Sequence, residues 1–102
     1  MKERTGLAGV FKALGDPTRL KILDLLKARG KSCCALVSAR EAGLCACDVE
    51  GAVGLSQAAV SHHMGVLVRS GLVTAEKRGR WIYYCRNETA LDALADSIAR
   101  AV

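Results

Sequence analysis

The sequence contains no apolar segment long enough to cross a membrane or to act as a signal peptide. A membrane-spanning helix needs about 20 consecutive apolar residues, and Lys12 interrupts the apolar residues near the N-terminus. Internal repeats, low-complexity tracts and interdomain linkers are absent too. We therefore expect the 102 residues to form one domain, over residues 1–102, and the protein to be cytoplasmic with no membrane partner.

The patterns of common small enzymes are also missing. No Cys-x-x-Cys motif occurs, so a small thiol oxidoreductase is only a remote alternative. This alternative would regain support if the protein did not bind double-stranded DNA in a salt-dependent manner. His62 and His63 cannot be matched from sequence with a nucleophile and an orienting acid. We expect no enzyme activity and no organic cofactor.

Charge and cysteine content indicate what the chain binds. Fifteen Lys and Arg against ten Asp and Glu give a formal net charge of +5, which suits a polyanionic partner without identifying one. In a reducing compartment, five cysteines are better explained as metal ligands or redox-active thiols than as structural disulfides. So small a domain buries a modest core, which favours dimers.

Two amphipathic helices are expected in the first third of the chain. The first ends near Gly15 and has its apolar face at helical spacing: Leu7, Val10, Phe11 and Leu14. Asp16 and Pro17 start the second, which we expect to end near Arg29, before Gly30, with an apolar side of Leu20, Ile22, Leu23, Leu25 and Leu26. Residues 31–43 fit either a short helix capped by Ser32 or a structured loop.

Residues 48–70 have the helix-turn-helix pattern. Asp48 to Val53 is predicted as a short helix, Gly54 and Leu55 as a tight turn, and Ser56 as the N-cap of a helix that runs to about Ser70 before Gly71. In helix-turn-helix proteins the second helix lies in the major groove of DNA.

The two faces of the 56–70 helix differ in character. At about 100° per residue, the core side is expected to contain Val60, Met64, Leu67 and Val68. The other side is the candidate DNA-binding face, on which small residues allow close approach and polar residues offer hydrogen bonds: Ser56, Gln57, Ala58, Ser61, His62, Gly65 and Arg69. The alternative is an ordinary solvated helix face.

A β-hairpin and a final helix complete the chain. Residues of about 72–86 are predicted to form two short strands around a turn at Arg78 and Gly79. Lys77, Arg78 and Arg80 at this turn are candidates for phosphate contacts, although basic turns are usually just solvated. Asn87 can cap a last helix with Leu91, Leu94, Ala95, Ile98 and Val102 at helical spacing.

Four segments together resemble one known family. DPTRLKILDLL, LCACDVE, GLSQAAVSHHMGVLVRSGLV and GRWIYYCRN are similar in order and spacing to the ArsR/SmtB family of winged-helix, metal-responsive repressors. The resemblance implies a mainly α winged helix-turn-helix fold with about five helices and a two-stranded wing. It also implies a homodimer through the first and last helices that binds double-stranded operator DNA and leaves it when a metal or metalloid binds.

The same resemblance suggests the inducer. Arsenic-responsive members have a Cys-x-Cys-x-x-Cys run at the start of the first helix of the pair, and Cys45 and Cys47 match its first two positions, while Glu50 occupies the third. We expect arsenite or antimonite to bind Cys45 and Cys47 with a third thiolate from Cys34 or Cys33, where the short loop closure costs little entropy. Cys85 is a less favoured third ligand because it lies on the wing.

Other ions and other roles remain open for these cysteines. Trivalent arsenic and antimony prefer sulfur and need three donors, whereas zinc prefers four. The family's other sensing site uses Asp and His on the last helix, which here has Asp92 and Asp96 but no His. Cadmium or zinc sensing, redox or persulfide sensing, and simple burial of each thiol are the alternatives.

The spacing of the two thiols predicts a mechanism. Residues i and i+2 of a helix point about 200° apart, so shared ligation should require Cys45 and Cys47 to lie outside the first helical turn or to be pulled out of it. The hypothesis is that the ion distorts the start of this helix and shifts the 56–70 helix.

Overall fold

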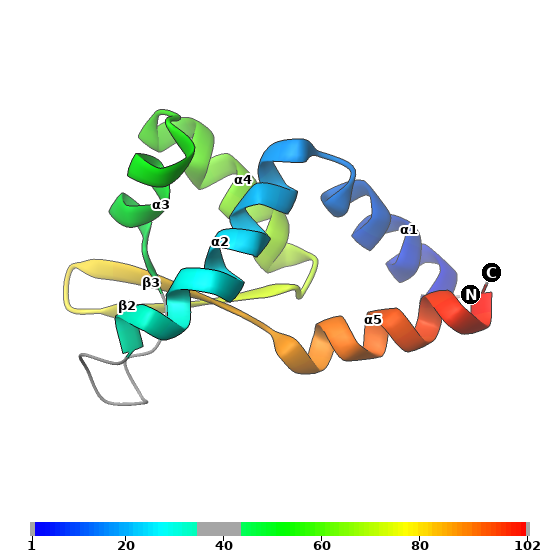
Figure 1. Cartoon of the computed structure of the whole chain (residues 1–102). Helices are drawn as coiled ribbons and strands as arrows, with labels where there is room; N and C mark the ends of the chain where they lie inside the picture. The colour runs from blue at the N-terminus through cyan, green and yellow to red at the C-terminus, as the bar shows by residue number, and fades with distance from the viewer. Residues whose placement is uncertain (1, 35–43, 102) are drawn as a thin grey trace.

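The computed structural model describes residues 2–34 and 44–101, with side chains described over 6–27 and 44–101. Within these ranges the elements, in order, are α1 (Lys2–Leu14), α2 (Pro17–Cys34), β1 (Leu44–Cys45), α3 (Ala46–Val53), α4 (Gln57–Arg69), β2 (Val73–Arg78), β3 (Trp81–Arg86) and α5 (Glu88–Ala101) (Figure 1). The described chain therefore has the predicted mainly α fold with a β-hairpin after the helix-turn-helix pair.

The predicted two-stranded wing is confirmed as β2 and β3, and the sheet has one further strand that was not predicted. It is antiparallel in the order β1-β3-β2, with Leu44 opposite Tyr84 and Cys45 opposite Tyr83. β1 was missed because a strand of two residues has no alternating pattern to detect. The hairpin turn also falls one residue later than predicted, since β2 still includes Arg78.

Helix boundaries differ from the prediction at two places. α2 continues through Gly30 to Cys34, so Ser32 does not begin a separate helix; a glycine inside a helix costs only about 1 kcal/mol relative to alanine and need not end it. α3 begins at Ala46, two residues before the predicted start. The remainder of the 31–43 segment, residues 35–43, lies outside the described residues.

The core gathers side chains from α2, α3, α4 and the sheet. Its buried members are Ile22, Leu23, Leu26, Leu44, Val49, Val60, Met64, Leu67, Leu72, Val73 and Tyr84. This confirms the predicted core side of α4, on which Val68 is only partly buried. Leu20, predicted on the apolar side of α2, is 51% exposed, because two residues before the fully buried Ile22 it points to the other side of the helix.

The first and last helices touch this core only through partly buried side chains, among them Val10 and Leu14 of α1 and Leu91 and Leu94 of α5. Figure 1 shows α1 and α5 extending on one side of the molecule, with the two ends of the chain close together. No described residue of α5 is buried. A cleft of about 540 Å³ runs between the two helices, and its lining includes Leu7, Val10, Leu94 and Ala101. Apolar side chains of both helices thus lack cover within one chain.

Among the described residues, no helix is both long enough and apolar enough to span a bilayer.

Candidate nucleic-acid interface and cysteine pair

A glycine turn sets the angle between α3 and α4. Gly54 has φ 70° and donates its backbone N–H to the carbonyl oxygen of Glu50, over 3.0 Å. A positive φ of this size favours glycine. Two residues later, the Ser56 hydroxyl accepts a hydrogen bond from the Ala59 N–H at 3.2 Å, which confirms the predicted N-cap.

The C-terminal end of α4 is also capped. Gly71, with φ 84°, follows the helix, and the Leu72 N–H donates back to the Leu67 carbonyl at 3.1 Å, the pattern of a Schellman cap. The Asn87 amide donates to the Gly71 carbonyl at 3.1 Å, while its Oδ1 accepts from the Ala90 N–H at 3.1 Å. One asparagine therefore caps α5 and holds it against the end of α4.

The outer face of α4 presents the predicted residues to solvent. Its exposed members are Gln57, Ala58, Ser61, His62 and Arg69, and the cap residue Ser56 is exposed as well. Gly65 is half-buried because the Arg69 guanidinium lies over it: a Cβ built on Gly65 would be 3.1 Å from Arg69 Nη1. The face is thus smooth at its centre, with polar groups toward its N-terminal end.

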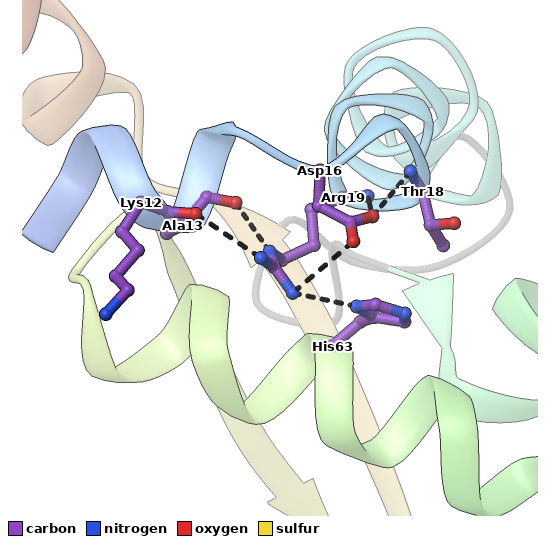
Figure 2. Close-up of polar contacts among 6 residues, drawn as sticks. All are labelled: Lys12, Ala13, Asp16, Thr18, Arg19 and His63. Atoms are coloured by element: carbon purple, nitrogen blue, oxygen red, sulfur yellow. Dashed lines mark hydrogen bonds and ion pairs between the residues drawn. The ribbon is translucent and has the colours of Figure 1, made fainter.

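His63, next to this face, has a partner that the sequence did not reveal. Figure 2 shows Arg19 reaching from α2 toward the His63 ring, and Nη1 of Arg19 lies 3.0 Å from Nδ1 of His63. The same guanidinium donates through Nε to the Ala13 carbonyl and through Nη2 to the Lys12 carbonyl at 3.3 Å. From sequence, the segment around Asp16 showed only a helix start.

Asp16 forms the base of this cluster. Its Oδ1 accepts from the N–H groups of Thr18 at 2.8 Å and Arg19 at 3.3 Å, and its Oδ2 is 4.0 Å from Arg19 Nη1. Burial alone would raise the pKa of the Asp16 carboxyl, but the two N–H groups and the charge of Arg19 outweigh it and hold this pKa below its ordinary value; His63 adds to this effect only when its ring is protonated.

The three basic residues of the wing do not have equal freedom. Lys77 and Arg80 are exposed. Arg78, in contrast, pairs with Glu76 through Nη2 at 2.7 Å and Nε at 2.8 Å, and its guanidinium lies 4.5 Å from the centre of the Tyr83 ring. Lys77 and Arg80 are therefore better placed to reach outward, while Arg78 braces the hairpin.

The thiols of Cys45, the N-cap of α3, and Cys47, in its first turn, are in contact. The sulfur atoms of Cys45 and Cys47 are 3.1 Å apart; Cys45 is buried and Cys47 is exposed. The hydrogen bond to Cys45 is the largest of several influences that raise the pKa of the Cys47 thiol, with burial and the negative charges of Cys45 and Asp48 acting in the same direction. A soft ion would bind the two sulfurs as thiolates and release their protons.

This contact corrects the expected mechanism. Cys45 has an extended backbone, φ −66° and ψ 148°, as the N-cap of α3, so the 200° rule for two helical residues does not apply to the pair. Cys47 lies within the first turn of α3, and no unwinding is needed to bring its sulfur to that of Cys45.

No third ligand lies beside Cys45 and Cys47 within the fully described residues. Over the described part of the chain, no group of three or more His, Cys, Asp or Glu side chains is placed to hold a metal ion. In this part of the single chain, Cys85 is not placed to form a triad with Cys45 and Cys47, and Asp92 and Asp96 of α5 are not part of such a group. Cys33 and Cys34 end α2, but their side chains lie outside the described residues.

Comparison with known proteins identifies the family. Residues 14–76, more than half of the chain, match the helix-turn-helix domain family. The arsenical resistance operon repressor of Staphylococcus xylosus is 39% identical over 92 residues, which cover 90% of this chain and 76% of that protein.

Solved structures agree with this match. An ArsR-like transcriptional regulator from a Rhodococcus species superposes with a TM-score of 0.77 at 30% identity, covering 99% of this chain and 83% of the other. The homodimeric winged helix-turn-helix DNA-binding domain of a possible ArsR-family regulator from Mycobacterium bovis gives a TM-score of 0.70 at 26% identity, covering 98% and 82%. The chain therefore belongs to the ArsR/SmtB family of winged helix-turn-helix transcriptional repressors.

Proposed function

We propose that this repressor binds its operator as a homodimer and releases it when trivalent arsenic or antimony binds Cys45 and Cys47. The observation that carries the proposal is the contact between the two sulfurs, 3.1 Å apart, at the start of α3. α3 is followed after a three-residue turn by α4, so the inducer site is next to the helix that contacts DNA.

The outer face of α4 is the proposed base-reading surface. Gln57, Ser61 and His62 offer hydrogen-bonding groups, and Ala58 with Gly65 lets the helix backbone approach the groove. Ser56 stands at the positive N-terminal end of α4, where a phosphate would be favoured.

Basic side chains of α4 and the wing supply the remaining contacts. Arg69, Lys77 and Arg80 are exposed and would bind phosphates, which makes affinity fall as salt rises. Arg78 has an indirect part, since its pairing with Glu76 keeps the hairpin in shape.

The uncovered helices supply the dimer contact. The cleft between α1 and α5 contains Leu7, Val10 and Leu94, and Phe11 is exposed. A second copy packed here buries these groups and gives two copies of α4. Their matching spacing on an inverted repeat is one turn of DNA, about 34 Å. The homodimeric Mycobacterium bovis neighbour supports this arrangement.

The sulfur separation is nearer to the value for a pyramidal ion than to that for a tetrahedral one. With metal–sulfur bonds of about 2.3 Å, sulfurs 3.1 Å apart subtend an angle of about 85° at the ion. Trivalent arsenic, with three bonds and a lone pair, is pyramidal and has angles below the tetrahedral value. A tetrahedral zinc ion would instead need the sulfurs about 3.8 Å apart.

The third thiolate is proposed to come from Cys34 or Cys33, at the end of α2. Because the sulfurs of Cys45 and Cys47 are already in contact, binding them alone requires little movement. The conformational change would come from joining the end of α2 to the start of α3, and α3 packs on α4. A coupling of about 1 to 3 kcal/mol is usual for such regulation, and a full switch takes about 5.5 kcal/mol.

The test is release from a duplex selected by the protein from a random library. Fluorescence anisotropy would follow titration with arsenite, antimonite, cadmium and zinc on the wild-type protein and on five single Cys→Ser variants. We expect Cys45→Ser, Cys47→Ser and one of the vicinal pair to bind DNA normally and resist arsenite, with Cys85→Ser as the responsive control. Full arsenite release from Cys45→Ser and Cys47→Ser would contradict the proposed site.

The same sulfur contact supports one alternative. Peroxide could oxidise the two thiols to a disulfide, with loss of two protons and two electrons and formation of two water molecules. Release by peroxide without any response to arsenite would favour this redox repressor.

A further inference from the structure

One arginine joins three helices of the domain. Arg19, on α2, donates to two carbonyl groups at the C-terminal end of α1 and to the imidazole of His63 on α4, as Figure 2 shows. Its side chain is only 13% exposed. The carbonyls of Lys12 and Ala13 are among the last of α1, where helix carbonyls lack intrahelical partners. The Lys12 carbonyl also accepts from the Gly15 N–H at 3.3 Å, so the guanidinium adds a second donor there, serves the Ala13 carbonyl and balances the negative end of the helix.

The fork shape of arginine is what makes this connection possible. Nε, Nη1 and Nη2 each point at a different acceptor, and a guanidinium holds its donors in a fixed plane. The Asp16 carboxylate helps to orient the guanidinium, since its Oδ2 is 4.0 Å from Nη1 of Arg19. A lysine could reach one of these acceptors but not all three.

We propose that Arg19 and His63 are a positioning pair that fixes α4 relative to α1 and thereby sets DNA affinity. The inference rests on the proposed function, in which α1 contacts the second copy and α4 contacts DNA. The distance between the two copies of α4 then depends on how each is held against its own α1. The pair touches no DNA; it acts through the orientation of α4.

The contact also requires one protonation state of His63. Arginine is only a donor, so Nδ1 of His63 must accept and the ring proton must be on Nε2. A second proton would occupy Nδ1, remove the hydrogen bond and place two positive charges 3.0 Å apart. An imidazole that gains a second proton cannot accept this hydrogen bond, so the pair should be weaker at acid pH.

The charged groups around His63 support that direction. Within the described residues, Arg19 faces the ring from α2, and Asp16, which precedes α2, acts on the ring only at longer range. The His62 ring is 5.3 Å away on α4 itself. From α1, the carbonyl of Lys12 contacts the guanidinium, and Figure 2 shows its ammonium pointing away from the ring. The nearest charge is thus the repulsive one.

The test must separate His63 from His62, the only other histidine of the chain. Protonation of His62 on the DNA face would raise affinity, whereas protonation of His63 should lower it. All proteins in the experiment therefore contain His62→Gln, and their affinity for the selected duplex is measured by anisotropy at pH 8.0, 7.0, 6.0 and 5.5. The parent is expected to lose affinity as pH falls, by about threefold or more.

Variants at the pair should remove this pH dependence. Arg19→Met is expected to bind about tenfold more weakly at pH 8 and with a flat profile. His63→Asn places an acceptor near the position of Nδ1 and cannot be protonated, so it should bind nearly as the parent does at pH 8 and more tightly at pH 5.5. Circular dichroism and sedimentation check that fold and dimer persist.

Arg86 provides the matched control. Its side chain is 18% exposed and joins β3 to Glu88 and to the Leu23 carbonyl, and within the described residues it has no hydrogen bond or ion pair with α4. Arg86→Met should lose stability but keep the parent's pH profile.

Two results would overturn the proposal. One is a parent whose DNA affinity does not change with pH, and the other is that the affinities of Arg19→Met and His63→Asn fall with pH as that of the parent does. If Arg19→Met does not fold, the pH dependence of DNA affinity in His63→Asn alone tests the proposal. Failure of the wild-type protein to bind any duplex would instead refute the proposed function.

Discussion

Gly65 offers a substitution whose effects on stability and on DNA binding should have opposite signs. It lies inside α4, where alanine is about 0.8 to 1.0 kcal/mol more favourable than glycine. The added Cβ would meet only the flexible end of the Arg69 side chain, at 3.1 Å, which can move aside at small cost. Gly65→Ala should therefore raise the free energy of unfolding by somewhat less than 1 kcal/mol, or about 3 to 6 °C in Tm.

The same methyl group should weaken binding to DNA. It stands at the centre of the proposed groove face and displaces the guanidinium of Arg69 from its place against the helix. A lost contact in the groove costs about 1 kcal/mol or more, roughly fivefold in affinity. The expected variant is thus more stable and binds less tightly, a combination that general damage to the fold cannot produce.

Gly51→Ala is the matched control for this experiment. Gly51 also lies inside a helix, α3, and is exposed, but a Cβ there has nothing within 4 Å. It should gain similar stability and bind the selected duplex as the wild-type protein does. Thermal unfolding by circular dichroism and anisotropy titration at fixed salt measure both quantities. Undiminished affinity in Gly65→Ala would refute the assignment of this face to the groove, and a lower Tm would refute the packing argument.

Three further predictions concern caps and thiols. Asn87→Ala should lower the free energy of unfolding by about 1 to 2 kcal/mol in urea, and Asn87→Asp by less, because aspartate keeps the cap and loses only the bond to Gly71. Cys45→Ala should lower the pKa of Cys47, since the hydrogen bond from Cys45 raises it; peptide-resolved alkylation of Cys47 at pH 7.5 should become faster, and an unchanged rate would count against this. Asp16→Ala should lower the free energy of unfolding at pH 7, because the Thr18 and Arg19 N–H groups lose their acceptor. Because the folded-state pKa of Asp16 is lowered, the difference from wild type should disappear as pH falls below the ordinary carboxyl range, and a constant difference would contradict the capping argument.

The long helices and the hairpin could be predicted because each has a strong local signal. Ser56, Gly71 and Asn87 mark element ends through groups that satisfy backbone donors and acceptors, and α4 has apolar residues at a clear period. β1 had no such signal, since two residues cannot show alternation and its pairing depends on β3, about 40 positions away in sequence. α2 continued past Gly30 because a glycine lowers helix stability without preventing the helix.

The residues of the candidate site could be predicted from the sequence, but the contacts between them could not. The cysteine spacing indicated a thiol site, but the contact of the two sulfurs depends on the extended backbone of Cys45, which follows from its place in β1. Arg19 and His63 are 44 residues apart, and no sequence pattern joins them. Likewise, the sequence did not reveal that Arg78, a predicted phosphate ligand, pairs with Glu76.

β1, the shortest strand that the structure describes, would determine how widely the proposed inducer acts. Cys45 is paired to Tyr83 in the sheet and is also the residue from which α3 starts. One backbone position is therefore shared between the wing and the helix-turn-helix pair. A displacement of Cys45 cannot be confined to either of them, so a single ion should disturb the phosphate contacts of the hairpin and the base contacts of α4 together, and the protein would leave its operator in one step rather than loosen at one end.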